Sequence, residues 1–144
     1  MMTPSFFIEH LWEDESMIEL RVIASDGLFS GCTQVYTSWI DFEAFADRLE
    51  GFPRSDQHVV EEKIGEIGGY SFLRLVFRCT DGNGHAILEV EMEKSQQQRG
   101  AANFRPRAKL YCGIEAWAID EFVVQLRTMH REKSGCARLS ANAA

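Results

Sequence analysis

The sequence has few cysteines, few prolines and no long apolar run. Its 144 residues include four scattered cysteines without a Cys-x-x-Cys spacing, which argues against a disulfide scaffold or a zinc site. No stretch approaches the ~18 consecutive apolar residues of a membrane-spanning helix. The first residues, MMTPSFFIEHLWEDE, lack the basic start and long apolar segment of a signal peptide. We therefore expect a cytoplasmic protein with reduced thiols that does not bind membranes.

Positive charge is also scarce, with 15 Lys and Arg against 22 Asp and Glu, a net charge of −7 and a pI of about 5.1. Nucleic-acid binding is not expected, because it needs a basic surface. The four histidines form no HxH or HExxH set, and neither GxxxxGK[ST] nor GxGxxG occurs. The sequence therefore predicts no catalytic residue, no metal site and no cofactor, although it does not decide whether the protein is an enzyme.

The clearest pattern lies in two alternating segments, 70–79 and 85–93, which are joined by the hairpin-forming turn sequence DGNG. If Thr80 pairs with His85, the apolar side chains of the two strands meet, and Arg74 lies opposite Glu91. A slip of one residue would separate both the apolar and the charged partners, so the register is well specified.

The segment 104–115 follows the same alternation. Pairing Glu93 with Arg105 puts Glu91 opposite Arg107, so acidic side chains have basic neighbours on both sides. The polar segment 94–103 is predicted to be a hairpin loop. Opposite charges across a sheet contribute only about 0.2–1 kcal/mol per pair, so solubility and register explain this charged face without a ligand.

Two further strands, 17–24 and 28–36, are expected to pair around a two-residue Asp26-Gly27 turn that puts Ser25 opposite Leu28 and Leu20 opposite Thr33. The segment 60–67 is expected to form a short strand. The segment 5–12 fits either a strand or the start of a helix.

Two amphipathic helices are predicted. Ser38 can cap the first, which spans 38–53 and ends at Gly51 and Pro53. The second spans 118–131. Each carries an apolar stripe at helical spacing: Phe42, Phe45, Ala46 and Leu49 in the first, and Ile119, Phe122, Val123, Leu126 and Met129 in the second.

These elements predict one α+β domain over residues 1–132, followed by a flexible C-terminal tail, 133–144. The domain is expected to hold a single antiparallel sheet of about six strands, with both helices packed on its apolar face.

The string DGNGHAILEVEME, the basic alternating strand after it, DEFVVQLR and the earlier WIDFEAFADRLEGFP resemble a family of small, uncharacterised bacterial proteins. In that family a D-G-x-G-H turn opens a charged strand, and the chain ends in a helix with an F-V-x-x-L-R pattern. The resemblance spans most of residues 17–129 and implies a fold and a bacterial source. It implies no activity and no site residues. Proteins of this size and style are often immunity or accessory proteins encoded beside toxins.

The function hypothesis is a non-enzymatic protein-interaction module that binds another protein or a second copy of itself through the charged outer face of the sheet. The outer face mixes aromatic, arginine and aliphatic residues, a composition that occurs at interfaces. The candidate face comprises Arg21, Gln34, Tyr36, Arg74, Arg78, Glu89, Glu91, Arg107 and Tyr111.

The alternative is a small-molecule binder or enzyme with a pocket between sheet and helices. The apolar face of the predicted sheet offers no convergent polar groups to line such a pocket, which counts against this alternative. Among the thiols, Cys79 and Cys112 fall on the apolar face. Cys32 falls on the outer face and is the better candidate for a reactive thiol.

Overall fold

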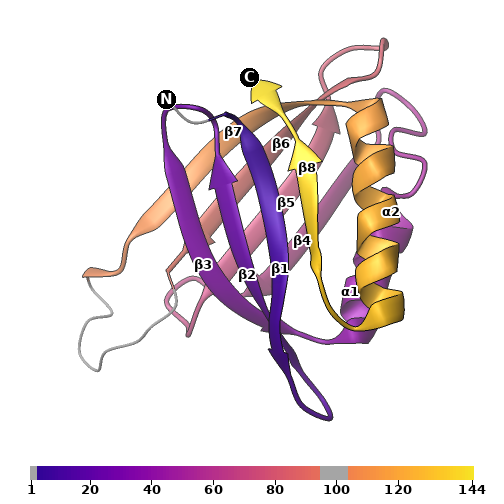
Figure 1. Ribbon diagram of the computed structural model, residues 1–144. Helices are drawn as coiled ribbons and strands as arrows, with labels where there is room; N and C mark the ends of the chain where they lie inside the picture. The colour runs from indigo at the N-terminus through magenta and orange to yellow at the C-terminus, as the bar shows by residue number, and fades with distance from the viewer. Residues whose placement is uncertain (1–2, 95–103) are drawn as a thin grey trace.

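The computed structural model describes residues 3–94 and 104–144, which form two antiparallel sheets and two helices. Figure 1 shows the two sheets facing each other, with both helices along one side of the space between them. The α+β class is confirmed, whereas the expected single six-stranded sheet is wrong. Alternation identifies the buried side of a strand but not what covers it, and here the two apolar sheet faces cover each other.

The first sheet has four strands in the order β3-β2-β1-β8, and its neighbouring strands pair antiparallel. Residues 5–12, which fit either strand or helix, belong to a strand whose Phe6 and Ile8 both point into the core. The strands are β1 (Ser5–Glu13), β2 (Ile18–Ser25), β3 (Ser30–Thr37) and β8 (Cys136–Ser140).

The second sheet has five strands in the order β4-β5-β6-β7-β9 and is also antiparallel. The expected strand near 60–67 is confirmed as β4. The strands are β4 (Val59–Gly65), β5 (Phe72–Cys79), β6 (His85–Glu93), β7 (Arg107–Glu115) and β9 (Asn142–Ala143).

Both predicted helices are present, as α1 (Trp39–Leu49) and α2 (Ala116–Glu132). Ser38 caps α1 as predicted, because its Oγ accepts a hydrogen bond of 3.1 Å from the backbone N–H of Asp41. The chain leaves α1 through Gly51, whose positive φ of 76° suits glycine. The helices do not lie flat on one sheet. They pack on each other, with α2 against β8, and close the open side of the sheet pair.

The predicted separation of apolar and polar positions is confirmed. Leu75, Leu88 and Leu110 on the second sheet are all at most 3% exposed, and they share one core with Val22 of the first sheet and Phe122 of α2. This core between two sheets and two helices holds the molecule together, because burial of apolar surface is the dominant favourable term in folding.

The C-terminal residues are structured, and the expectation of a flexible tail is wrong for residues 136–143. β8 pairs with β1, with Leu139 opposite Phe6, and both Ala137 and Leu139 are fully buried. β9 then pairs with β7. The polarity of this segment suggested fraying. A strand on the surface of the molecule, however, needs apolar side chains only at every second position, and here Ala137 and Leu139 supply them.

The β5–β6 hairpin has the predicted register, with Phe77 opposite Leu88 and Arg74 opposite Glu91. Two other predicted registers are wrong by two residues. Leu20 lies opposite Val35 because the β2–β3 turn spans residues 26–29, and Glu93 lies opposite Arg107. In both cases every side chain keeps its expected face, since a two-residue shift preserves the alternation. The predicted loop 94–103 lies outside the described residues except for Lys94.

The strand β3 crosses the ends of the strands of the second sheet. At its start, a Cβ on Gly31 would lie 2.9 Å from Met92 Sδ and 3.1 Å from Ala108 Cβ, so glycine permits the close approach. Further along, Thr33 Oγ1 donates a hydrogen bond of 2.7 Å to the Glu93 carbonyl. The end of β3 then reaches β4, and the space left between these two strands forms the candidate site.

Candidate functional site

The candidate site is an open groove between β3, β4 and the start of α1. It consists of two adjoining cavities of about 550 and 600 Å³ that share Met17, Tyr36, Ile64 and Gly65. β3 and β4 are edge strands of their sheets, so the groove lies where the two sheets fail to join. The polar cavity is lined in addition by Ser16, Thr37, Ser38, Asp41, Ala44, Arg48, Glu62 and Lys63, and the apolar cavity by Glu66, Gly69, Tyr70 and Ser71.

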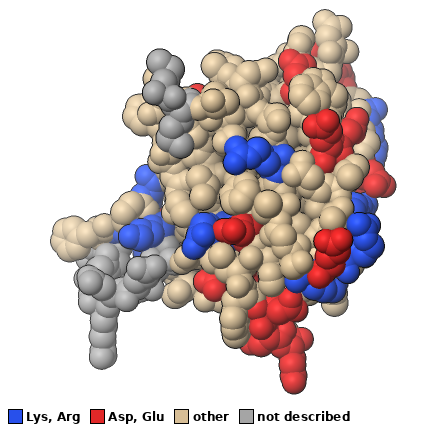
Figure 2. All heavy atoms as spheres, viewed as in Figure 1, with Lys and Arg blue, Asp and Glu red and all other residues tan. Residues whose placement is uncertain are grey.

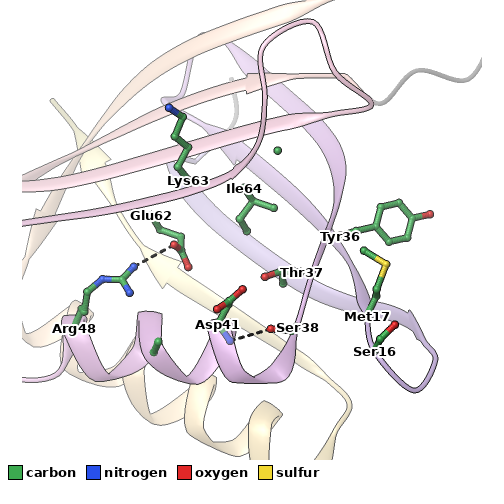
Figure 3. A pocket seen from close by; sticks show the side chains of 12 residues that line it. Ser16, Met17, Tyr36, Thr37, Ser38, Asp41, Arg48, Glu62, Lys63 and Ile64 are labelled. Carbon is green, nitrogen blue, oxygen red and sulfur yellow. Dashed lines mark hydrogen bonds and ion pairs between the residues drawn. The ribbon is translucent and has the colours of Figure 1, made fainter.

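The polar cavity brings together two carboxylates and one guanidinium, as Figure 3 shows. Arg48 on α1 donates from Nη2 to Glu62 Oε1 at 3.1 Å and to the Glu61 carbonyl, also at 3.1 Å. Asp41 lies two turns before Arg48 on α1, and its negative charge acts on Glu62. Lys63 points away from these groups, because side chains alternate along β4.

Glu62 is a charged residue at an inward-facing position of β4. It lies opposite Leu75 and borders Phe42 and Leu73 of the core. Burial raises the pKa of the Glu62 carboxyl, the Arg48 charge and hydrogen bond lower it, and the net shift is upward. At neutral pH the ionised Glu62 therefore costs folding free energy that a neutral side chain would not cost.

This convergence contradicts the expectation that no polar groups meet on the apolar side of the sheet. The sequence held a signal for Glu62, since Val60, Glu62 and Ile64 alternate and the flanking two are apolar. Asp41 and Arg48 could not be found in that way, because both are ordinary solvent-side residues of an amphipathic helix. Asp41 and Arg48 come close to Glu62 only because the folded chain places α1 next to β4.

The apolar cavity is built from aromatic and aliphatic side chains. The Tyr36 and Tyr70 rings lie 5.6 Å apart at an angle of 53°, beside Met17 and Ile64. Tyr36 donates its hydroxyl to Glu19 Oε2 at 3.3 Å. Burial, then the Glu19 charge, raises the pKa of Tyr36 to about 12, so it stays neutral at physiological pH.

A buried ion pair fixes the far wall of the groove. Glu93 Oε1 lies 2.6 Å from Arg105 Nη1, and the two side chains are 1% and 3% exposed. The same Oε1 accepts the backbone N–H of Gly68 at 3.1 Å, and Arg105 donates to the Gly69 carbonyl. The glycine-rich loop 66–71 is thus held to β6 by charged groups, which sets the position of Tyr70.

The near wall is fixed by contacts around Trp39, the first residue of α1. Its indole stacks on His10 of β1, with ring centroids 5.5 Å apart, and meets His130 of α2 edge-on at 6.0 Å. Lys133 Nζ lies 4.8 Å from the indole centroid, in the geometry of a cation–π contact. The start of α1, which carries Ser38 and Asp41, is therefore held by β1 and α2 together.

The nine residues of the predicted interaction face do not form one face. Arg21, Gln34 and Tyr36 lie on the first sheet, and the other six lie on the second. Because the inner faces of the two sheets face each other, their outer faces point away from each other. Only Tyr36 lines the groove. The second-sheet residues are Arg74, Arg78, Glu89, Glu91, Arg107 and Tyr111.

Three of the six residues on the second sheet, Arg74, Glu89 and Glu91, form an ion network with Glu61 of β4. The Arg74 guanidinium lies 2.8 Å from Glu61, 2.7 Å from Glu89 and 3.9 Å from Glu91. Under this network Val76 is only 1% exposed, although it points outward. The network covers the outer face of the sheet, which explains these charges without a ligand. The neighbouring Arg107 pairs instead with Glu93, at 3.0 Å.

Replacement of Arg74 by alanine is expected to lower the free energy of unfolding by about 1–2 kcal/mol, because Glu89 loses its closest cation while being mostly shielded from water. Urea denaturation followed by tryptophan fluorescence would measure the change. The control is Arg78→Ala, an exposed position on the same face of β5, with an expected change within about 0.5 kcal/mol. A loss above about 3 kcal/mol at Arg74 would contradict a partly solvated network.

The other candidate side chains stay apart from the groove. Cys112 is buried, and burial raises the pKa of its thiol to about 11, so it is not a nucleophile at neutral pH. Cys32 is exposed on the first sheet, as expected. His85 lies between Asp81 at 2.7 Å and Glu115 at 3.6 Å, and the Asp81 hydrogen bond raises the pKa of the imidazole.

Figure 2 shows the outer side of the four-stranded sheet, where uncharged atoms predominate and acidic atoms gather at the lower end, at the β1–β2 turn. Within residues 3–94 and 104–144, no three His, Cys, Asp or Glu side chains are grouped to hold a metal ion. Neither of the described helices is long and apolar enough to span a membrane.

Comparison of this chain with protein-family models, with curated proteins and with solved structures gives no match. The resemblance to a family of small bacterial proteins therefore stays a prediction.

Proposed function

We propose that this protein is a non-enzymatic interaction module that holds an extended segment of another protein in the groove between β3 and β4. The observation that carries the proposal is the continuity of the two cavities, one polar and one aromatic, along the open junction of two sheet edges. An extended chain presents every second side chain to the surface that it lies on. A groove whose lining changes from charged to aromatic along its length suits such a ligand.

The lining favours binding over catalysis. Its side chains in the described residues include no histidine and no cysteine, and the Ser38 hydroxyl is already engaged in capping α1. The two carboxylates and the guanidinium can recognise charge, and the two tyrosines supply apolar contact with few rotatable bonds. Both walls are anchored, by Trp39 and by Glu93, so the groove is preorganised.

Small-molecule binding is the second candidate, because each cavity has the volume of a small-molecule site and Glu62 has a raised pKa. The same experiment separates the two. The outer face of the second sheet, which the sequence predicts as the interaction site, is the other surface at which a peptide could bind.

The test begins with selection of binders from a random 12-residue phage-displayed peptide library on the full-length protein. Enriched peptides are then titrated into ¹⁵N-labelled protein. We expect amide shift changes at residues 36–41 and 62–71, and loss of binding in Ala44→Trp, which fills the polar cavity from α1. Ile40→Trp is the matched control, because Ile40 is 82% exposed on the same helix and does not line the groove.

Absence of enriched peptides would overturn the proposal, and so would shift changes confined to the outer face of β5–β7. Equal binding by wild type and Ala44→Trp would show that the peptide binds elsewhere, which also contradicts the proposal.

A further inference from the structure

We infer that the groove selects an extended segment in which a lysine or arginine lies two residues before or after an aromatic or large aliphatic residue, because alternate side chains of an extended chain point to the same side. The basic side chain binds between Asp41 and Glu62, and the apolar one packs on Tyr36 and Tyr70. This inference rests on the proposed function and adds the chemistry of the partner. It depends on the unequal lining of the two cavities and on the charge around them.

The charge balance of the groove favours a basic ligand. Asp41, Glu62 and Glu66 line the groove. Glu19 adds a further negative charge near the apolar cavity, where it accepts a hydrogen bond from the Tyr36 hydroxyl. Among the described lining residues, Arg48 is the one cation whose side chain is turned toward the carboxylates, since Lys63 points to the other face of β4. The whole chain carries a net charge of −7, which favours encounter with a basic partner.

Arg48 already shows how a cation is received. Its guanidinium binds Glu62 at 3.1 Å while its side chain is 44% exposed, whereas Glu62 is only 15% exposed. The carboxylate is fixed in the wall and the arginine reaches it from the solvent side. An incoming basic side chain can therefore replace Arg48 on Glu62 without moving the carboxylate, so Arg48 competes with the ligand.

The electrostatic state of Glu62 agrees with this exchange. Because burial raises its pKa even with Arg48 present, the negative charge is incompletely neutralised. A ligand cation that also satisfies Asp41 would stabilise both ionised carboxylates and lower the pKa of Glu62. Binding is thus expected to weaken as the pH falls and Glu62 takes up a proton.

The tyrosine pair supplies the second part of the selectivity. Its tilted rings and the thioether of Met17, beside the aliphatic side chain of Ile64, form a surface that remains partly solvent-exposed, with Tyr70 49% and Met17 43% accessible. Aromatic and methionine surfaces of this kind adapt to apolar side chains of different shapes. We therefore expect aromatic and large aliphatic side chains to bind at the tyrosine pair with similar affinity.

The test uses four peptides of one length: Ac-Gly-Lys-Thr-Phe-Thr-Gly-NH₂, the same peptide with norleucine or glutamate for lysine, and the same peptide with serine for phenylalanine. Each is titrated into ¹⁵N-labelled full-length protein, and dissociation constants come from the amide shifts. Loss of the charge or of the ring is expected to weaken binding about tenfold, and glutamate to weaken it further.

Two variants give opposite expected effects, which a purely structural role would not produce. Glu62→Gln is expected to weaken the lysine peptide about tenfold while leaving the protein at least as stable, because a neutral group suits the raised pKa. Arg48→Met is expected to tighten it several-fold by removing the competing cation. Urea denaturation of both variants confirms that each is folded.

Each outcome decides the inference. Equal affinity for the lysine, norleucine and glutamate peptides would overturn it and leave the proposed function intact if the shifts still map to the groove. Weaker binding of the lysine peptide by Arg48→Met than by wild type would overturn the proposed replacement of Arg48 by the ligand cation on Glu62. No shift in the groove with any peptide would overturn both the inference and the proposed function. Binding of n-butylammonium as tight as the lysine peptide would show a small cation, not a protein segment, as the occupant.

Discussion

Replacement of Glu93 by alanine is expected to lower the free energy of unfolding by about 3–5 kcal/mol, the cost typical of removing one partner from a buried ion pair. The variant removes the carboxylate that neutralises Arg105, whose side chain is 3% exposed. It also removes the acceptor of the Gly68 N–H, so the loop 66–71 loses its attachment to β6. Since small domains are stable by about 5–15 kcal/mol, this is a large fraction of the total.

Equilibrium urea denaturation of wild type and Glu93→Ala would measure the effect. Glu91→Ala is the matched control, because Glu91 lies two residues earlier on the same face of β6 with a side chain that is 32% exposed. The decrease in the free energy of unfolding for Glu91→Ala is expected to stay below about 1 kcal/mol. Similar losses at the two positions would show that the Glu93 pair is solvated and does not fix the groove wall.

Replacement of Leu139 by alanine is expected to cost about 2–5 kcal/mol, the range for truncation of a buried leucine. Leu139 is fully buried in β8, opposite Phe6 of β1, in a segment whose composition suggested a tail. Truncation would leave a cavity between the first sheet and α2, which packs on β8.

The matched control for this prediction is Ser140→Ala, the next residue of β8, which is exposed. Its expected change is within about 0.5 kcal/mol. Thermal or urea denaturation of the pair distinguishes a structural strand from a frayed end. Equal stability of the Leu139 variant and wild type would contradict the assignment of residues 136–140 to the core.

The sequence predicted local structure well where two independent signals agreed. In the β5–β6 hairpin the DGNG turn and the apolar alternation both require Phe77 opposite Leu88, and the register is as predicted. In the β2–β3 hairpin the Asp26-Gly27 signal alone predicts a two-residue turn. Instead Asp26 Oδ1 accepts the backbone N–H groups of Leu28 and Phe29, which extends the turn to four residues.

The β6–β7 register shows the limit of charge pairing as a guide. Glu93 has a basic residue opposite whether it pairs with Arg105 or with Arg107, because both lie on the same face of the strand. The structure uses both, with Arg107 opposite in the ladder and Arg105 as the buried partner. Equally spaced like charges cannot define a register beyond its parity.

The groove could be predicted only in part. The inward position of Glu62 follows from alternation between Val60 and Ile64, and a buried carboxylate marks a candidate site. Its partners come from α1 and its aromatic neighbours from β3 and the loop 66–71, and their meeting depends on how the two sheets cross. Alternation within one strand carries no information about that crossing.

The pairing of β1 with β8 has a consequence for biosynthesis. Phe6 is synthesised well before Leu139, which lies opposite it in the finished molecule. Until then the outer edge of β1 has no neighbour and its apolar side chains lack part of their cover. We expect nascent chains to depend on chaperones until β8 has been made, because such unpaired edges favour aggregation.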